Sequence, residues 1–191
     1  MIDKLKSDIE DCLICENFLP NRPRPIFQFS NKSKILIIAQ APGQKAHDKG
    51  IPFDDLSGDN LRSWLGITKE QFYNSDLFAI MPMGFCFPGK GKSGDLPPRK
   101  ECAPHWHNKI MDQFENLELI ILIGKYSQDY YLKNNPHKNL TETVISYQNI
   151  LPKYFPLVHP SPLNFRWQAK NKWFLERIIP ELQKKVASII N

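Results

Sequence analysis

The sequence predicts an α/β fold with three layers, in which helices cover both faces of a central four-stranded, mainly parallel sheet. Four short, nearly continuous apolar runs are separated by segments with helical periodicity, which is the order of elements typical of this class. The chain has 191 residues, of which 41% are hydrophobic. One core can be buried by a chain of this size, so residues 1–191 are expected to form a single domain.

The four predicted strands are apolar along their whole length. They occupy residues 34–40 (KILIIAQ), 76–81 (DLFAIM), 117–123 (LELIILI) and 154–158 (YFPLV). A strand with one face in water alternates between apolar and polar residues, whereas a strand buried on both faces does not. These runs therefore indicate a parallel sheet covered on both sides.

Helices are predicted between and after the strands. They cover residues 58–65, 101–114, 125–132 and 171–190. Ser57 is expected to cap the first of them, and Gly124 precedes the third. The last helix carries an apolar stripe suited to packing on the core, and Pro180 is expected to kink or split it.

Residues 82–104 (PMGFCFPGKGKSGDLPPRKECAP) are rich in Gly, Pro and Lys and are predicted to form one long loop. Loops of this length inside compact domains are usually either functional or disordered. A cysteine lies near each end of the segment, so we expect it to be ordered and anchored.

The chain contains four cysteines, Cys12, Cys15, Cys86 and Cys102. A Cys-x2-Cys pair can hold one metal centre from a single turn, and two distant thiolates can complete a set of four ligands. Two alternatives stay open: a disulfide framework, which suits small secreted domains, and four unrelated buried thiols that pack as small hydrophobes. The spacing favours a metal or cluster site.

Composition limits the class of protein only loosely. A formal net charge of +5 suits a polyanionic partner but is shared by many ordinary enzymes. The N-terminal residues lack the apolar run of a signal peptide, and the longest dense apolar stretch, 119–123, is too short to cross a bilayer. We expect a soluble, cytoplasmic protein with reduced cysteines and no membrane partner. No coiled-coil or repeat pattern is present, so a monomer is expected.

Two short motifs follow predicted strands. AQAPG at 39–43 follows the first strand, and HPSP at 159–162 follows the last. Ligands of parallel α/β sheets bind beyond the carboxyl ends of the strands, so we expect these motifs to share a pocket. Each motif alone is weak, because Pro-Gly turns are common and a lone strand-end histidine is more often a satisfied core residue.

In combination, the motifs resemble a known family. AQAPG, the GIPF of residues 50–53, the long cysteine-containing loop and HPSP together resemble the uracil-DNA glycosylase superfamily, and the four-cysteine spacing is similar to that of its iron-sulfur branch, family 4. The resemblance runs from Cys12 to about Trp167. It implies a glycosylase fold and removal of a damaged base from DNA.

The resemblance also implies roles for particular residues. His159 matches the histidine that donates a hydrogen bond to uracil O2, and Phe53 matches the aromatic ring on which the flipped base stacks. The loop beside the sugar and the attacking water is matched by Gln40, Ala41, Pro42 and Gly43. Loops that hold the DNA backbone are matched by Ser161 and Pro162, with residues 97–99. The ligands of a [4Fe–4S] cluster are matched by Cys12, Cys15, Cys86 and Cys102, and zinc in the same cage is the alternative.

The active-site motifs depart from the family pattern. The best-known members have Asp or Asn where this chain has Ala41, and the iron-sulfur branch has Glu where this chain has Gln40. An amide can orient water but cannot act as a general base. Among nearby carboxylates, Asp54 and Asp55 are the preferred substitutes, with turn formation and helix capping as the alternative interpretation.

Base recognition departs as well. Residues 80–85 lack the Asn that reads the uracil edge in relatives, and Gly43 stands where the best-studied relatives use Tyr to reject thymine. The choice of substrate therefore stays open: uracil is the default, and hypoxanthine, xanthine or another damaged base is the alternative.

The leading hypothesis is a DNA glycosylase that hydrolyses the N-glycosidic bond of a deaminated base in base excision repair. The alternative is a glycosylase-fold protein, held together by an iron-sulfur cluster, that binds DNA without excising a base. A third hypothesis is an enzyme of the same fold acting on a free nucleoside or nucleobase.

Overall fold

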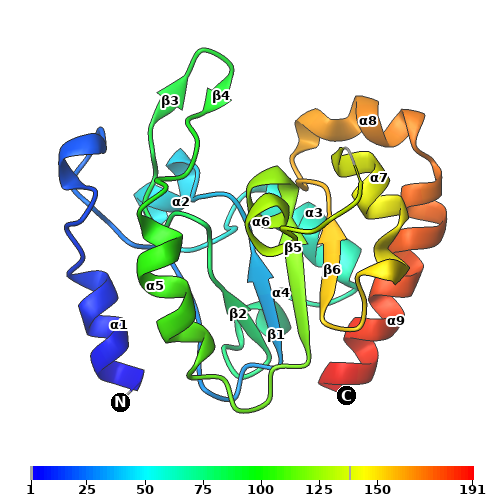
Figure 1. Cartoon of the computed structure of the whole chain (residues 1–191), viewed down its shortest axis with the longest axis horizontal. Helices are drawn as coiled ribbons and strands as arrows, with labels where there is room; N and C mark the ends of the chain where they lie inside the picture. Colours follow the sequence, from blue (N-terminus) through cyan, green and yellow to red (C-terminus); the bar gives the residue numbers. More distant parts are fainter. Residues whose placement is uncertain (1, 138) are drawn as a thin grey trace.

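A four-stranded sheet lies at the centre of the structure, a computed structural model that describes residues 2–137 and 139–191 (Figure 1). The strand order is β2-β1-β5-β6 and each neighbouring pair is parallel. The strands are β1 (Ile35–Ile38), β2 (Phe78–Ile80), β5 (Leu119–Ile123) and β6 (Tyr154–Leu157). The predicted fold class is confirmed, with each strand lying inside its predicted apolar run.

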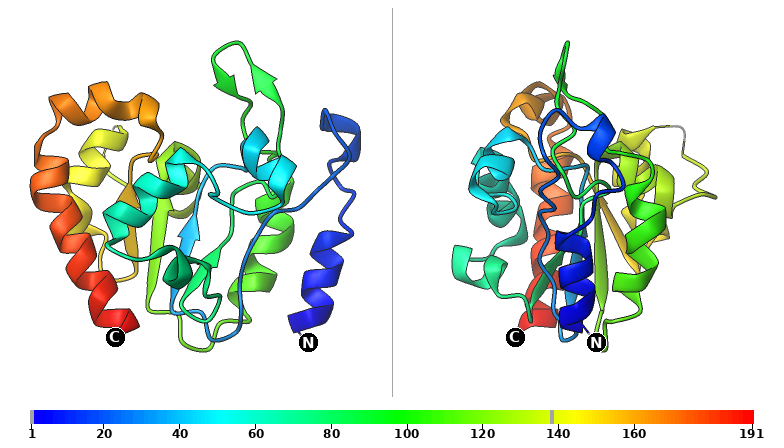
Figure 2. Two further views of the ribbon diagram at one scale, coloured as in Figure 1. Left: turned by 180° about the vertical axis from the view of Figure 1, so that it is seen from behind. Right: turned by 90° about the vertical axis from the view of Figure 1, so that its left-hand side faces the viewer.

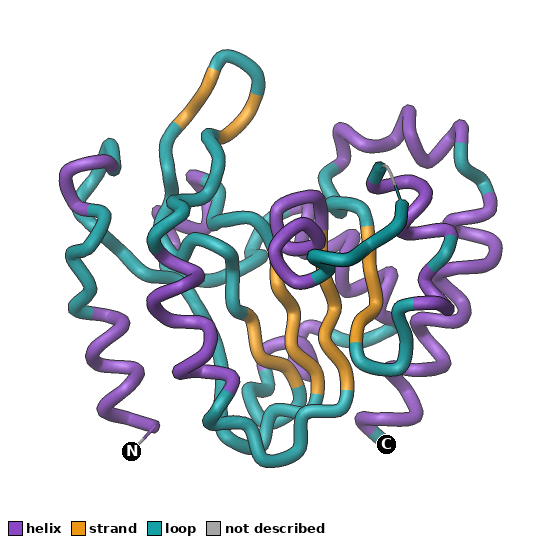
Figure 3. Tube along the Cα trace, viewed as in Figure 1, coloured by secondary structure: helices purple, strands orange, loops and turns teal. Residues whose placement is uncertain are grey.

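The register of the sheet aligns the strand ends. Ile35 pairs with Phe78 on one side and with Leu119 on the other, and Ile120 pairs with Tyr154. Because all four strands run in one direction, the segments that follow them emerge at one edge of the sheet (Figure 3). The termini of the chain lie at the opposite edge (Figure 1).

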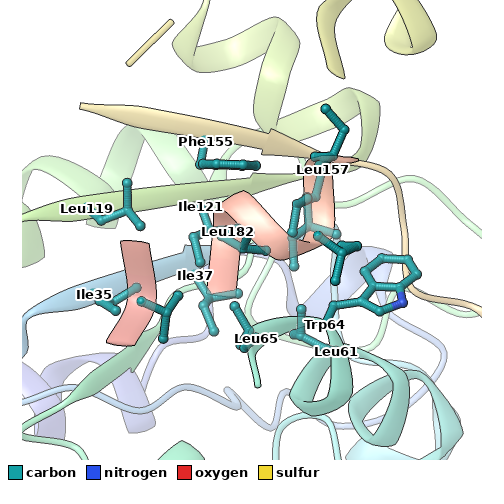
Figure 4. Close-up of a cluster of buried hydrophobic side chains, with 14 of the residues drawn as sticks. Ile35, Ile37, Leu61, Trp64, Leu65, Leu119, Ile121, Phe155, Leu157 and Leu182 are labelled. Carbon is teal, nitrogen blue, oxygen red and sulfur yellow. The ribbon is translucent and has the colours of Figure 1, made fainter. Parts of the chain in front are cut away.

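One face of the sheet packs against α3 (Leu56–Leu65) and α9 (Ile179–Ile190). Figure 4 shows Ile37 and Ile121 of the sheet beside Leu65 and Leu182 of these helices. Alternate residues of each strand point to this face, and the side chains in it are almost fully buried. Continuous burial on both faces is the reason that the strands lack polar alternation.

The other face carries a second apolar cluster, against α1 (Ile2–Glu10) and α5 (Cys102–Met111), with α6 (Gly124–Tyr131) beside them (Figure 2). Leu36 and Ile38 of β1 contribute to it, together with Trp106 and Ile110 of α5. The α1 helix, which the sequence analysis did not predict, is amphipathic and buries Ile9.

The start of α3 differs from its prediction. Its N-cap is Asp55, whose side chain accepts a hydrogen bond from the Gly58 backbone N–H, so the prediction of Ser57 as cap was wrong. An Asp oxygen is as good an acceptor as a Ser hydroxyl at this position, and the turn before the helix decides which residue is used.

The predicted C-terminal helix, residues 171–190, contains the π-helical η4 (Phe174–Ile178) and α9. A short helix that was not predicted, α8 (Phe165–Lys170), precedes it. Pro180 lies in the first turn of α9, directly after the π-helical η4. Proline removes one i→i−4 hydrogen bond and crowds the preceding turn, and a π-helical turn is one way in which a helix accommodates this. The helix is therefore not split at Pro180: η4 runs into α9 without a break, and its turns change from π to α just before the proline.

The remaining elements are short. They are α2 (Gln44–Lys49), α4 (Lys69–Tyr73), α7 (Leu140–Ile145), η1 (Glu16–Phe18), η2 (Tyr147–Asn149), η3 (Pro162–Asn164) and the hairpin of β3 (Lys90–Gly91) and β4 (Gly94–Asp95). The hairpin lies inside the long loop and projects beyond the edge at which the sheet strands end (Figure 1). None of the helices in the described residues is long and apolar enough to cross a membrane.

Candidate active site

A pocket of about 180 Å³ lies at the edge where the sheet strands end. Drug-sized ligands need cavities of about 300–1,000 Å³, so this one suits a smaller ring. It is lined by Ala39, Ala41, Pro42, Gly43, Ala46, Pro52, Phe53, Asp55, Ser57, Ile80, Pro82, Asp95, His159 and Ser161. The segments after β1 and β6 therefore meet as expected, and a third segment, the β3–β4 hairpin, joins them.

His159 follows β6 and its hydrogen bonds fix its tautomer. The Ser161 backbone N–H donates to His159 Nδ1 at 3.2 Å, so the proton of the neutral ring is on Nε2. Burial lowers the pKa of His159, and the nearby carboxylates of Asp55 and Asp95 oppose this shift. A neutral ring that presents an N–H to a partly desolvated pocket can stabilise negative charge there without carrying a charge itself.

The loop that carries His159 is held by two amides. Asn164 Nδ2 donates to the His159 carbonyl at 2.6 Å, and Asn60 Nδ2 donates to the Pro160 carbonyl at 2.9 Å. Asn60 lies in α3, so this bond joins the loop after β6 to the helix beside the pocket.

Phe53 contributes an aromatic ring to the pocket from a strained backbone. Its φ of 56° lies in the left-handed region, which is uncommon for a bulky side chain. The Phe53 carbonyl accepts a hydrogen bond from Arg62 Nη1 at 3.2 Å, and the ring makes an edge contact with Phe72. A Cβ atom on Gly58 would lie 1.7 Å from the Phe53 carbonyl oxygen, so this conformation requires glycine at position 58.

The AQAPG loop enters the pocket only in part. Ala41, Pro42 and Gly43 line it, whereas Gln40 is not among the lining residues. Gln40 Nε2 donates to the Leu96 carbonyl at 3.3 Å and the Gln40 carbonyl accepts from the Gly84 N–H. Gln40 thus joins the loop after β1 to the hairpin.

The two candidate carboxylates are separated by the structure. Asp55 lines the pocket while one of its oxygens caps α3. Asp54 is not among the lining residues. Its carboxylate forms ion pairs with Lys49 and Lys69, and these hydrogen bonds, that from Lys49 first, lower its pKa. An ion-paired carboxylate outside the cavity is poorly placed to act on a bound base.

The HPSP segment is divided in the same way. Ser161 lines the pocket, and its hydroxyl accepts a hydrogen bond from the Leu163 N–H. Pro162 is exposed outside the lining and begins η3. Leu163 next to it is 84% exposed, the largest exposed fraction among the large hydrophobic residues described.

Asp95 is a pocket residue that the sequence analysis missed. It lies in the Gly- and Lys-rich stretch whose side chains are typical of phosphate contact or a solvated loop. Only the pairing of Lys90 with Asp95 in the hairpin places the carboxylate over the pocket. No periodicity in the sequence could have indicated this placement.

Residues 27–183 match the family model described as "Uracil DNA glycosylase superfamily". The chain belongs to this superfamily. The match covers most of the chain and includes each of the pocket residues, as well as Cys86 and Cys102, but it begins after Cys12 and Cys15. Superfamily membership indicates a DNA glycosylase-like function and hydrolysis of N-glycosidic bonds as the general chemistry.

The four cysteines of this superfamily member line a second pocket, and none of them is in a disulfide. Within residues 2–137 and 139–191, no group of three or more His, Cys, Asp or Glu side chains could hold a metal ion. Around one zinc ion, a Zn–S length of about 2.3 Å brings the sulfurs within about 4 Å of each other. In a four-iron cluster each thiolate binds a different iron, so the sulfurs stand farther apart.

Each of these sulfurs has a hydrogen-bond donor. Trp106 Nε1 donates to Cys12 Sγ at 3.4 Å, and the Phe85 N–H donates to Cys102 Sγ at 3.4 Å. The Arg99 side chain donates a hydrogen bond to Cys15, and the Arg24 backbone donates one to Cys86. Burial raises the pKa of Cys86 to about 11 and that of Cys102 to about 12. Because metal binding deprotonates such thiols, this donor set fits a cationic group bound by thiolates.

Proposed function

We propose that this protein is a monofunctional DNA glycosylase that releases a deaminated base, uracil as the default, and leaves an abasic site. The observation that carries the proposal is the neutral His159 ring, with its proton on Nε2, in the same small pocket as the ring of Phe53. Breaking the bond between the sugar and the base leaves negative charge on the base. A fixed N–H aimed at that charge lowers the barrier.

The size and lining of the pocket support a base that has left the helix. Unstacking a base costs a few kcal/mol, and stacking on an aromatic ring such as Phe53 returns about 1–3 kcal/mol of this. The polar side chains of the lining are those of Asp55, Ser57, Asp95, His159 and Ser161. Residues 80–85 contain no Asn or Gln side chain. Recognition of the base edge therefore falls to these five side chains and to backbone groups.

The surroundings of the pocket support DNA as the partner. Lys92 of the hairpin is exposed, as is Arg166 of α8, and hairpin and helix both lie at the edge that carries the pocket (Figure 1). Cations in such positions neutralise phosphates. The exposed Leu163 beside the pocket is suited to fill the gap that an extruded base leaves, as apolar wedges do in other DNA-bending proteins.

The excision assay uses single- and double-stranded oligonucleotides with one uracil, hypoxanthine or xanthine, at enzyme excess, with abasic sites revealed by alkaline cleavage. Uracil-dependent cleavage is the expected result. His159→Ala should slow it roughly 100- to 1,000-fold, since removing one such donor costs about 2.7–4 kcal/mol. His137→Ala, in the loop between α6 and α7, is the control and should retain the wild-type rate.

Two results would redirect the proposal. Salt-dependent DNA binding with no abasic product, unchanged in His159→Ala, would favour the binding protein without excision. Release of uracil from free deoxyuridine but not from DNA would favour a nucleoside hydrolase of the same fold.

We further propose that the four cysteines hold a [4Fe–4S] cluster that joins the N-terminal segment to the long loop. The support is a single pocket lined by all four thiols, a hydrogen-bond donor to each sulfur, and the similarity of the four-cysteine spacing in the sequence to that of the iron-sulfur branch. Such a cluster would tie residues 12–15 to α5 and to the segment before the hairpin.

Protein purified without oxygen should contain about four iron and four sulfide per chain and show visible absorbance. Zinc in place of iron would refute the assignment. Cys102→Ser should lose the iron, and Ser188→Ala, on the exposed side of α9, should retain it.

A further inference from the structure

The β3–β4 hairpin brings the carboxylate of Asp95 into the pocket. None of the sequence motifs indicates this residue. Asp95 is the last residue of β4 and lines the pocket, with its side chain 30% exposed. It faces the loop after β1, because a Cβ atom on Gly43 would lie 3.3 Å from Asp95 Oδ2. Glycine at position 43 therefore leaves the space into which this carboxylate reaches.

The hairpin holds Asp95 from both sides. Lys90 Nζ lies 3.0 Å from Asp95 Oδ1, and the two residues are paired across the strands. The Leu96 N–H donates to the Gly89 carbonyl at 2.8 Å, and Gln40 donates to the Leu96 carbonyl. One carboxylate oxygen is thus ion-paired with the hairpin and the other is directed to Gly43.

Other carboxylates near the pocket are less suited to act on water. Asp54 is ion-paired with two lysines outside the lining, and Asp55 uses an oxygen to cap α3. The loop after β1 offers only the neutral Gln40 and Ala41. Asp95 is the described carboxylate that both lines the pocket and approaches this loop.

We propose that Asp95 is the general base of the glycosylase reaction proposed above, on which this inference rests. As the bond between C1′ and the base nitrogen breaks, its electron pair leaves with the base. A water oxygen forms a new bond to C1′, and Asp95 accepts the proton that this water loses. The products are the free base and an abasic deoxyribose, and the proton passes from Asp95 to the base or to solvent. His159 stabilises the departing base. Asp95 thus acts on the attacking water and His159 on the leaving group.

The test is Asp95→Asn, which keeps the size and the hairpin but cannot accept a proton. Single-turnover excision of uracil should slow about a hundredfold or more, as general bases contribute about 10²–10⁴-fold. Affinity for uracil-containing DNA should stay within about threefold. Asp8→Asn is the matched control, because Asp8 also pairs with a lysine, Lys4, but lies in α1. It should excise at the wild-type rate.

The pH profile distinguishes a base from a group that only hydrogen-bonds the substrate. The titratable groups facing Asp95 are Lys90 of the hairpin, Asp55 before α3 and His159 after β6. Excision by the wild type should fall at low pH, and Asp95→Asn should lose this acid limb. His159→Ala, although slow, should retain the limb.

The outcomes separate the two proposals. A wild type that excises no base would overturn both. A wild type that excises uracil, with Asp95→Asn within about threefold of it, would overturn the role of Asp95 alone. So would a slow Asp95→Asn enzyme that keeps the acid limb, or one that loses DNA affinity by the same factor as rate.

Discussion

Gly58→Ala should destabilise the protein although it lies in a helix, where this change normally stabilises by up to about 1 kcal/mol. The added Cβ would lie 1.7 Å from the Phe53 carbonyl oxygen, so helix and carbonyl must separate by more than 1 Å. Overpacking of this kind costs about 1–3 kcal/mol, and the hydrogen bond from Arg62 to the same carbonyl is strained or lost. We expect a net loss of about 1–3 kcal/mol in the free energy of unfolding, measured by urea denaturation.

The same movement displaces the Phe53 ring from the pocket. A misplacement of about 1 Å can slow a reaction about a hundredfold, so single-turnover excision should fall by about that factor. Ser63→Ala, on the exposed side of the same helix, is the control and should change stability by less than about 0.5 kcal/mol. If Gly58→Ala were as stable as the wild type and equally fast, the close approach of Gly58 to Phe53 would not constrain the pocket.

Three further predictions concern His107, His159 and Asn60. Burial lowers the pKa of His107 to about 4. The unfolded chain therefore takes up this proton first as pH falls, and stability should drop by about 3 kcal/mol between pH 6.5 and pH 4. The free energy of unfolding of His107→Gln, measured by urea denaturation, should not show this drop between pH 6.5 and pH 4. The same drop in the variant would show that His107 is not its cause. Nitrogen NMR should show the proton of His159 on Nε2, because Nδ1 accepts from the Ser161 N–H, with a titration midpoint below 6.5; a proton on Nδ1 would refute this geometry. Asn60→Ala should lose about 1 kcal/mol of stability, because its bond to the Pro160 carbonyl is removed, and its excision rate should fall with unchanged DNA affinity. A fall in affinity alone would show that this bond does not position the loop.

The sequence was most informative where one local pattern determines the result. Continuous apolar runs gave four parallel strands because a strand buried on both faces has no place for polar alternation. The position of the pocket followed from the rule that ligands bind at the carboxyl ends of such strands. It brought His159, Phe53 and the loop after β1 together as predicted from their motifs.

Helix ends and short elements were less predictable. Asp55, Ser57 and Thr68 are all good N-caps by type. The structure uses Asp55 and Thr68 because the chain turns at those residues. The helix α1 was missed although its apolar residues Ile2, Leu5 and Ile9 have helical spacing, so here the local signal was present and was overlooked.

The sequence by itself determined the sheet, its two buried faces and the edge at which the chemistry lies, because these depend on periodicity and on strand direction. Tertiary structure alone decided which carboxylates line the pocket. Asp54 lies outside the lining and is paired with two lysines, whereas Asp95 reaches the pocket from a hairpin that has no apolar pattern. The physical reason is that a side chain at a loop tip is placed by pairing and close approach between distant segments. Neither leaves a local signal in the order of residues.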